Sequence, residues 1–270
     1  EMTDVFAIQD EICQAIVDNL RVQLTPGRPL VKRYTENLET YNLYLKGRYY
    51  LEKFTPEALA KGKACLEQAI AQDPSYAPAW CGVADLYWFS AFFGLLPPRE
   101  AVPKARSAAL EARRLDDSLA EAHATLGVLH ATQDFDWIGA EREFRRALEL
   151  APASSSSRVP YAQMFLLPMR RLEEARAQAQ RTLELDPLSL LCHLQLGYVL
   201  YLMRQYDRAI EQLRSTLELD PSYFNAHWAL GLTYCQKGMS EQAVAAVERA
   251  RELSGGCLLY TSDAADEEDS

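Results

Sequence analysis

The residues best suited to chemistry in this chain are its four histidines and six cysteines. His123 and His130 stand seven residues apart, a spacing that puts both on one face of a helix and would in principle let them share a ligand. The cysteines include no Cys-x-x-Cys pair, the usual ligand spacing of a structural zinc site. We therefore interpret the two histidines as packing residues that replace an aromatic side chain, and we expect neither a metal site nor a cofactor.

Short catalytic motifs are also missing from the sequence. It contains no glycine-rich phosphate-binding loop, no His-Glu-x-x-His zinc motif and no Gly-x-Ser-x-Gly nucleophile elbow. The densest charged groups, Glu173-Glu174 and Glu141-Arg142-Glu143, are interpreted as solvent-facing residues of helices, with i,i+4 ion pairs worth only ~0.2–0.5 kcal/mol each. We therefore expect no catalytic residues and a chain that is not an enzyme.

Charge composition narrows the kinds of partner. The 270 residues include 38 acidic and 28 basic ones, a net charge of −10. Five of the acids lie in the last eight residues, so the rest of the chain has 33 acids against 28 bases and a net charge of −5. A nucleic-acid-binding surface needs clustered basic residues. Because the run Arg142, Arg145 and Arg146 is interpreted as the solvated side of a helix, we expect no nucleic-acid partner.

Apolar stretches in the sequence are too short to span a membrane. The most apolar one, residues 86–96, has eleven residues before Pro97-Pro98, whereas a spanning helix needs about 20. Cysteines without a disulfide pattern suit a reducing compartment. We expect a cytoplasmic chain, with the extracytoplasmic region of a membrane-anchored regulator as the alternative.

The elements that must position these residues repeat along the chain. Leu196-Gly197 returns 34 residues later as Leu230-Gly231, and Ala209 returns as Ala243. A period of 34 residues built from two helix-length segments is typical of a stacked helical solenoid. The glycine falls in the middle of the first helix, where it costs up to ~1 kcal/mol relative to alanine. We infer that a partner helix crosses there too closely for a Cβ atom.

The second helix of this unit has a clear apolar face and a clear end. Ala209, Leu213 and Leu217 recur four residues apart. Asp220-Pro221 ends the helix, because the residue before a proline is pushed out of the helical region. With the glycine, this pattern resembles the tetratricopeptide repeat, in which small residues at a helix crossing alternate with large ones that fill the gap.

The resemblance implies an all-α fold, a right-handed superhelical solenoid of about six tetratricopeptide-like helix-turn-helix units over residues 37–254. Each unit contributes small or boundary residues to its helix crossing. These structural repeat positions are Gly47, Ala69, Trp80, Ala84, Ala105, Gly127, Ala140, Ala147, Gly197, Ala209, Pro221, Gly231 and Ala243.

Four units depart from the regular spacing, and the unit that contains Gly47 and Ala69 has about three residues added. One residue is added at the turn of residues 134–137, and the unit of residues 154–187 has a first helix weakened by Pro160 and Pro168. About nine residues are inserted after Trp88, where residues 88–99 are expected to form an apolar loop. We expect this loop to cap the preceding repeat; the alternatives are that it folds over the groove or docks a partner.

Both ends of the chain fall outside the repeats. Residues 1–24 are expected to form an amphipathic helix that ends a missing upstream domain, because an apolar stripe runs from Val5 to Leu20. Residues 25–36 are expected to be a linker. The run of residues 4–12 resembles a junction of large bacterial regulators, where an upstream kinase, cyclase or winged-helix module meets a tetratricopeptide region.

The last residues resemble something other than a protein domain. Residues 257–267 are similar to the translation of a sequencing adaptor, and the segment is acidic. We therefore expect residues 255–270 to be a disordered tail of artificial origin, and the chain to be a fragment.

In tetratricopeptide arrays the first helices line a concave groove, so the resemblance also implies where a partner would bind. Aromatic side chains with a polar group suit peptide recognition, although each could instead pack against a neighbouring helix. The groove positions by register are Trp88, Phe89, Tyr198, Tyr201, Asn225, Trp228 and Gln236.

These observations favour a non-catalytic protein–protein interaction scaffold that binds a peptide or partner protein in its groove. The alternative is the regulatory region of a larger bacterial Ser/Thr kinase, adenylate cyclase or winged-helix transcriptional regulator. Self-association is a further possibility. The clamp of Lys, Arg and Asn that holds chaperone tails is not expected, because the equivalent positions are Cys81, Ala124, Leu194 and Trp228.

Overall fold

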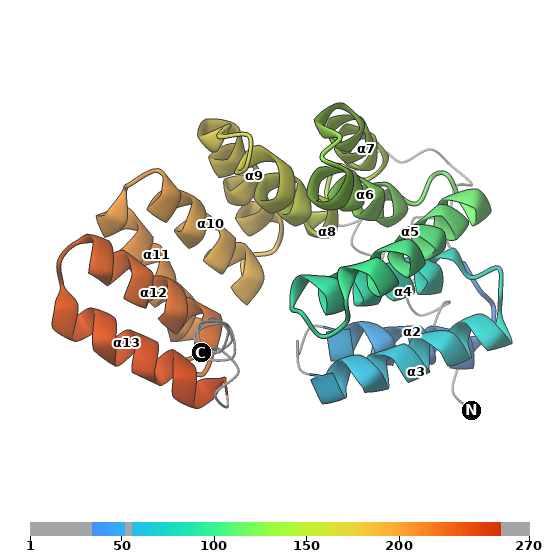
Figure 1. The fold of residues 1–270 in the computed structure, drawn as a ribbon, viewed down its shortest axis with the longest axis horizontal. Helices are drawn as coiled ribbons and strands as arrows, with labels where there is room; N and C mark the ends of the chain where they lie inside the picture. The colour runs from blue at the N-terminus through green and yellow to red at the C-terminus, as the bar shows by residue number, and fades with distance from the viewer. Residues whose placement is uncertain (1–33, 52–55, 255–270) are drawn as a thin grey trace, which may run out of the picture.

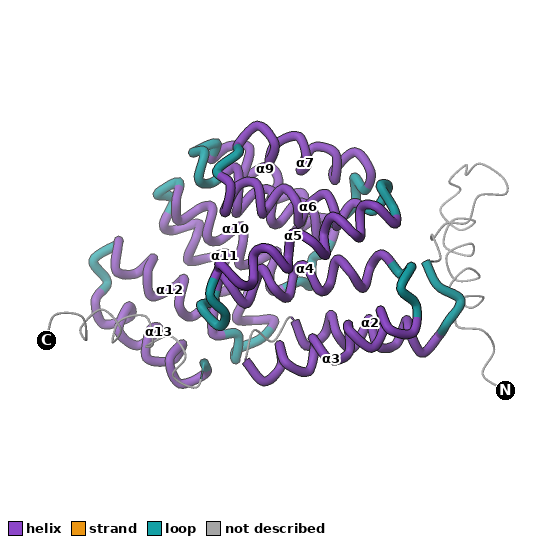
Figure 2. Tube along the Cα trace, turned by 45° about the vertical axis from the view of Figure 1, so that its right-hand side comes forward, coloured by secondary structure: helices purple, strands orange, loops and turns teal. Residues whose placement is uncertain are grey.

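The computed structural model describes residues 34–51 and 56–254, and in this part of the chain the regular secondary structure is entirely helical. The expected N-terminal helix, most of the expected linker and the expected tail lie outside the described residues. Figures 1 and 2 show an arched array of antiparallel helices. The helix pairs are α2 (Leu38–Leu51) with α3 (Pro56–Gln72), α4 (Ala77–Phe92) with α5 (Pro98–Leu115), α6 (Ala120–Leu129) with α7 (Trp137–Leu150), α8 (Ser155–Pro160) with α9 (Leu172–Leu185), α10 (Leu190–Leu202) with α11 (Tyr206–Leu219), and α12 (Phe224–Gln236) with α13 (Ser240–Leu253).

The six pairs form a curved double layer. The first helix of each unit contacts the first helix of the next, from α2 to α12, whereas the second helices make no comparable contact with one another in the described part of the chain. A double layer bends toward the side on which its members lie closer together. The first helices therefore form the concave side, and the prediction of an all-α helical solenoid is confirmed.

A side chain of the first helix secures each described junction between units. It donates a hydrogen bond to the carbonyl oxygen six residues earlier, in the turn that ends the preceding unit. Each accepting carbonyl group lies two residues beyond the end of the preceding helix, so the bond satisfies a backbone acceptor of the turn. The bonds run from Trp80 to Pro74 (3.0 Å), His123 to Asp117 (2.9 Å), Arg158 to Pro152 (2.5 Å), His193 to Pro187 (2.9 Å) and His227 to Pro221 (2.9 Å).

Within a unit, the two helices cross where the first one carries glycine. A Cβ atom built on Gly197 would lie 2.7 Å from Cδ2 of Leu213, and one on Gly231 would lie 2.5 Å from Cγ2 of Val247. Of the thirteen structural repeat positions, all are buried except Trp80, which is half-buried, and Pro221, which is exposed. The exposed Pro221 still has a structural role, because its carbonyl group accepts the junction bond from His227.

The insertion after Trp88 is a longer helix rather than a long loop. Helix α4 continues to Phe92, and only residues 93–97 separate it from α5, so the expected loop of residues 88–99 is wrong. The helix continues because no breaker occurs before Gly94, whose φ is +69°. Phe92 stacks on Trp88 of the same helix, with ring centroids 5.1 Å apart. The turn of the preceding unit lies outside the described residues, so capping stays a prediction.

The third and fourth units depart from the regular helix geometry. The residue added in the third unit is taken up by a π-helix, η1 (His130–Asp134), and by Phe135 in the left-handed region at φ +54°. The first helix of the fourth unit is only six residues long and continues as a second π-helix, η2 (Tyr161–Leu166). π-Helices are rare and occur often at functional sites.

Candidate functional site

The concave side of the last two units is free of formal charge apart from histidine. Helices α10 and α12 contain no Asp, Glu, Lys or Arg, whereas their partners α11 and α13 carry several of each sign. The uncharged character does not come from complete burial, since side chains of both helices reach solvent. The last two units therefore separate an uncharged concave layer from a charged convex layer.

Large side chains stand exposed on this concave layer. Tyr198 is 39% exposed and Trp228 37%, and on α10 they are joined by Leu191 at 41% and Leu202 at 37%. Leu191, Tyr198 and Leu202 recur at helical spacing, so they form one stripe along α10. Tyr201 stacks on Tyr198 with ring centroids 6.1 Å apart. Exposed aromatic and leucine side chains on a rigid helical layer are able to bury apolar surface of a partner.

The structure divides the seven residues predicted to line the groove. Tyr198, Trp228 and Gln236 are exposed, and Tyr201 and Asn225 are half-buried, all on α10 and α12. Phe89 is half-buried and packs against the hydrophobic core. Trp88 is buried, and its placement in the groove is wrong.

Trp88 is buried because the next unit covers it. Its indole Nε1–H donates to Oγ1 of Thr132 in η1, at 3.4 Å. The π-helix of the third unit thus extends far enough to reach α4. The regular repeat period does not predict the contact between Trp88 and Thr132, because that contact depends on the residue added in the third unit.

A polar network occupies the concave layer of the first three units. Asp85 of α4 accepts hydrogen bonds from Nη1 of Arg48 at 2.7 Å and from Oγ1 of Thr125 at 2.8 Å. Burial works against the charged guanidinium, but the ion pair with Asp85 outweighs it and raises the pKa of Arg48. One carboxylate thereby ties α2, α4 and α6 together, and most side chains of α4 and α6 are buried.

The two histidines singled out from the sequence have separate partners. His123 is buried, and its Nδ1 lies 2.7 Å from Oε2 of Glu143 while its Nε2 donates to the Asp117 carbonyl. The Nδ1 of His130 is buried and lies 3.0 Å from Oδ2 of Asp134, but the two atoms do not have the geometry of a hydrogen bond. Glu143 was interpreted as solvent-facing, and that is wrong: it is 6% exposed because the helix turns it toward His123. In the described residues no three His, Cys, Asp or Glu side chains are grouped to hold a metal ion.

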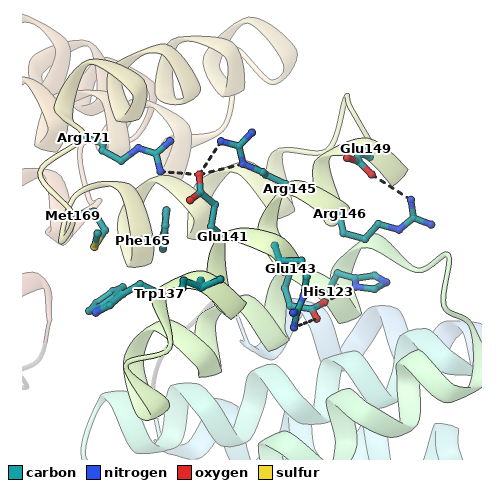
Figure 3. A pocket seen from close by; sticks show the side chains of 12 residues that line it. His123, Trp137, Glu141, Glu143, Arg145, Arg146, Glu149, Phe165, Met169 and Arg171 are labelled. Carbon is teal, nitrogen blue, oxygen red and sulfur yellow. Dashed lines mark hydrogen bonds and ion pairs between the residues drawn. The ribbon is translucent and has the colours of Figure 1, made fainter.

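A hollow of about 750 Å³ lies on the outer side of the third and fourth units, mostly against α7. Figure 3 shows Trp137, Phe165 and Met169 at one end of it, and the ion pairs of Arg145, Arg171, Arg146 and His123 along the rest. Sequence reasoning did not predict this hollow. The added residue at 134–137 and the prolines of the fourth unit were its only signals in the sequence.

The geometry defines a helical-repeat solenoid, and comparison with known proteins specifies the repeat. Residues 197–238 match the family model described as TPR repeat, so the predicted resemblance to the tetratricopeptide repeat is confirmed. The fold also resembles two solved structures. The Cut9–Hcn1 structure of the APC/C has a TM-score of 0.58 at 20% identity, covering 80% of this chain and 40% of that one. PilW, described as a type IV pilus biogenesis factor, has a TM-score of 0.57 at 14% identity, covering 80% and 94%.

Two bacterial regulators or enzymes are similar in sequence. The transcriptional regulator HilA of Salmonella typhimurium is 27% identical over 179 residues, which is 65% of this chain and 32% of HilA. A Rhizobium meliloti protein that bears the name of an adenylate cyclase is 27% identical over 132 residues, 47% of this chain and 22% of that protein. The chain thus spans about a third or less of the length of these relatives. None of its described helices has the length and apolarity needed to cross a bilayer.

Proposed function

We propose that this chain is a protein–protein interaction scaffold that binds a partner through the concave side of its last two units. The observation that carries the proposal is the uncharged layer of α10 and α12, with Tyr198 and Trp228 exposed on it. Neighbouring units hold these helices in place, so a partner meets a surface that is already ordered. The partner segment best suited to this layer is apolar and carries few charges, because a charge placed there would lose hydration without gaining an opposite charge.

We further propose that the scaffold works within a larger regulatory protein. Its two similar relatives bear the names of a transcriptional regulator and an adenylate cyclase, and each is much longer than this chain. In such a protein the scaffold would be the non-catalytic part that recruits or senses a partner, and the output would belong to another domain. Cytoplasmic placement fits the free thiols of Cys65, Cys81, Cys192 and Cys235, and we propose it on that basis.

Selection of peptides from a random 12-residue display library on the purified chain tests the concave site. The selected peptides should be rich in leucine and aromatic residues and poor in charge. Their Kd, measured by fluorescence anisotropy, should rise at least about tenfold in Trp228→Ser and in Tyr198→Ser, as expected for central aromatic anchors.

Val244→Ser is the matched control, since Val244 is 57% exposed but lies on the outer helix α13. Equal loss of binding in the control would point to a general effect on the fold. Peptides that bind wild type and both groove variants alike would overturn the concave site.

A further inference from the structure

We propose that the hollow on the outer side of the third and fourth units is a second binding site, which takes an acidic segment of a partner protein that inserts an apolar side chain. This site is separate from the concave layer of α10 and α12, so the two are able to be occupied at once. The proposal does not depend on the proposed function, because it concerns other helices and a different ligand chemistry.

The hollow exists because two neighbouring units are irregular. In the third unit, η1 and Phe135 in the left-handed region connect α6 to α7. In the fourth unit, α8 gives way to η2, and Arg170 at φ +56° turns the chain into α9. No other described unit combines these features, and the hollow of about 750 Å³ lies where the two irregular units meet.

One end of the hollow is apolar and open to solvent. Ile138 is 83% exposed and Met169 43%, and both line the hollow beside Trp137 and Phe165. Phe135, 68% exposed, continues the same surface, with its ring 6.3 Å from that of Trp137. Ile138 and Phe135 are the most exposed isoleucine and phenylalanine in the described chain. Exposed apolar side chains gathered around a hollow are typical of an interaction site.

The rest of the hollow carries an excess of positive charge. Its lining includes four arginines and three glutamates, and His123 lies at its base. Both ring nitrogens of His123 face oxygen atoms, and the Asp117 carbonyl is able only to accept a hydrogen bond. With Glu143 ionised, His123 must therefore carry both ring protons, and the lining then has two more positive than negative charges. This contrasts with the net charge of −10 of the chain.

The carboxylates of the hollow are already engaged, whereas some arginine donors are not. Glu141 accepts hydrogen bonds from both Arg145 and Arg171, each at 2.8 Å. Arg142 is 70% exposed, and its Nη2 lies 3.7 Å from Oε1 of Glu143, which is too far for a hydrogen bond. A guanidinium carries five N–H donors and binds a carboxylate in bidentate fashion. An incoming Asp or Glu is therefore the ligand that Arg142 is able to bind without displacing a strong native partner.

These two features fix the chemistry of the partner segment. An aliphatic or aromatic side chain would cover Ile138 and Met169, while carboxylates further along the same segment would lie along the arginines of α7. A basic segment would meet the excess positive charge, and an uncharged one would leave Arg142 unpaired.

A labelled synthetic peptide with the sequence Leu-Phe-Asp-Glu-Leu-Glu-Asp-Leu-Glu-Glu tests the site by fluorescence anisotropy on the whole chain. We expect binding that weakens as salt is raised from about 50 to 300 mM, because exposed charges are screened over these concentrations. The same peptide with Lys at every acidic position should not bind. Absence of binding by the acidic peptide, or equal binding by the lysine peptide, would overturn the proposal.

Variants locate the peptide on the molecule. Arg142→Glu and Ile138→Asp should each weaken binding at least tenfold. Their matched controls, Arg208→Glu and Val244→Asp, change exposed residues of α11 and α13 and should leave binding unchanged. If Ile138→Asp lowers the thermal midpoint, Met169→Asp in the neighbouring turn tests the same apolar end. Trp228→Ser should bind the acidic peptide normally, so that failure of the concave site is distinguishable from failure of this one.

Discussion

Individual hydrogen-bonding side chains decide how neighbouring units are joined. The histidines at these junctions differ in the group that their second ring nitrogen faces. In the fifth unit, the Nε2 of His193 donates to the Pro187 carbonyl, and its Nδ1 lies 2.7 Å from Nε2 of Gln212. His123 makes the same carbonyl bond but faces Glu143 with its other nitrogen. One repeat position therefore pairs its imidazole with an amide side chain in the fifth unit and with a carboxylate in the third.

The pKa values of the two residues of this buried pair, His123 and Glu143, are shifted in opposite directions. Burial works against the charged His123, but its hydrogen bonds with Glu143 and with the Asp117 carbonyl outweigh burial and raise the pKa of His123. The hydrogen bond from His123 lowers the pKa of Glu143, although burial opposes this. The histidine contribution to stability is complete below its unfolded pKa of about 6.5 and is lost as pH rises through the raised pKa. The glutamate contribution is present above about pH 4.3 and is lost as pH falls through the lowered pKa.

We therefore predict that His123→Gln destabilises the chain most between about pH 4.3 and 6.5. The free energy of unfolding, measured with urea across this range and at about pH 9, should differ from wild type more at the lower pH. His227→Gln is the matched control, since it removes the equivalent bond to a carbonyl group and, in the described residues, no bond to a carboxylate. A difference for His123→Gln that does not vary with pH would show that the pair is not ionic.

Paired helices keep the repeat's residue types where they cross, whereas the turns that connect them vary in residue type. The crossings of α10 with α11 and of α12 with α13 both place a glycine against an aliphatic side chain of the second helix. The five described turns between paired helices each contain one residue with positive φ. Only Gly94 and Gly238 are glycines, while Phe135, Arg170 and Arg204 adopt the same region with a side chain. The crossing therefore constrains residue type more tightly than the turn does.

Gly197→Ala should overpack the crossing of α10 and α11 at a cost of roughly 1–3 kcal/mol. The added Cβ would lie 2.7 Å from Cδ2 and 2.8 Å from Cγ of Leu213, closer than carbon atoms tolerate. Urea unfolding monitored by circular dichroism measures the loss.

A double-mutant cycle separates packing from helix propensity. Leu213→Ala removes the atoms that the new Cβ would meet, so the double variant should lose less stability than the two single variants together. Strict additivity would mean that Gly197 is retained for some reason other than the close crossing.

Across the whole molecule, burial is greatest in the middle of the array. Helix α6 is buried along almost its whole length, and α4 nearly so, because each is flanked by first helices on both sides. At the described ends, α2 exposes Leu45 and Tyr49, and α13 exposes Val244. In a repeat array each unit is stabilised mainly by its neighbours, so units with one neighbour open most readily.

Amide hydrogen exchange should therefore be slowest in α4 and α6 and fastest in α2 and α13. Mass spectrometry of peptides from each helix measures the exchange rates to be compared. The solvent exposure of each peptide in the structure serves to separate surface effects from opening of the unit. Equal protection in all the described helices would indicate a single cooperative unit instead of an array that opens from its ends.

Much of this architecture was predictable from one sequence because the same residue pattern recurs in it several times. Gly197 and Gly231 return at a fixed spacing, and helix geometry converts that spacing into a recurring close contact. Tyr198 and Trp228 were also placed on the accessible first helices by the same register. Trp88 and Glu143 were misplaced, because each is buried by a contact with another helix that the spacing does not encode.

The sequence by itself determined the helical repeat, its glycine crossings and the uncharged composition of residues 190–202 and 224–236, since these depend on local periodicity and residue type. Only the tertiary structure decided that the first three units close their concave layer around Asp85 and that the third and fourth units enclose a hollow on the outer side. The physical reason is that both features join side chains from different helices. Their meeting depends on how the helices pack against one another, and around the hollow this packing involves two π-helices and the short α8.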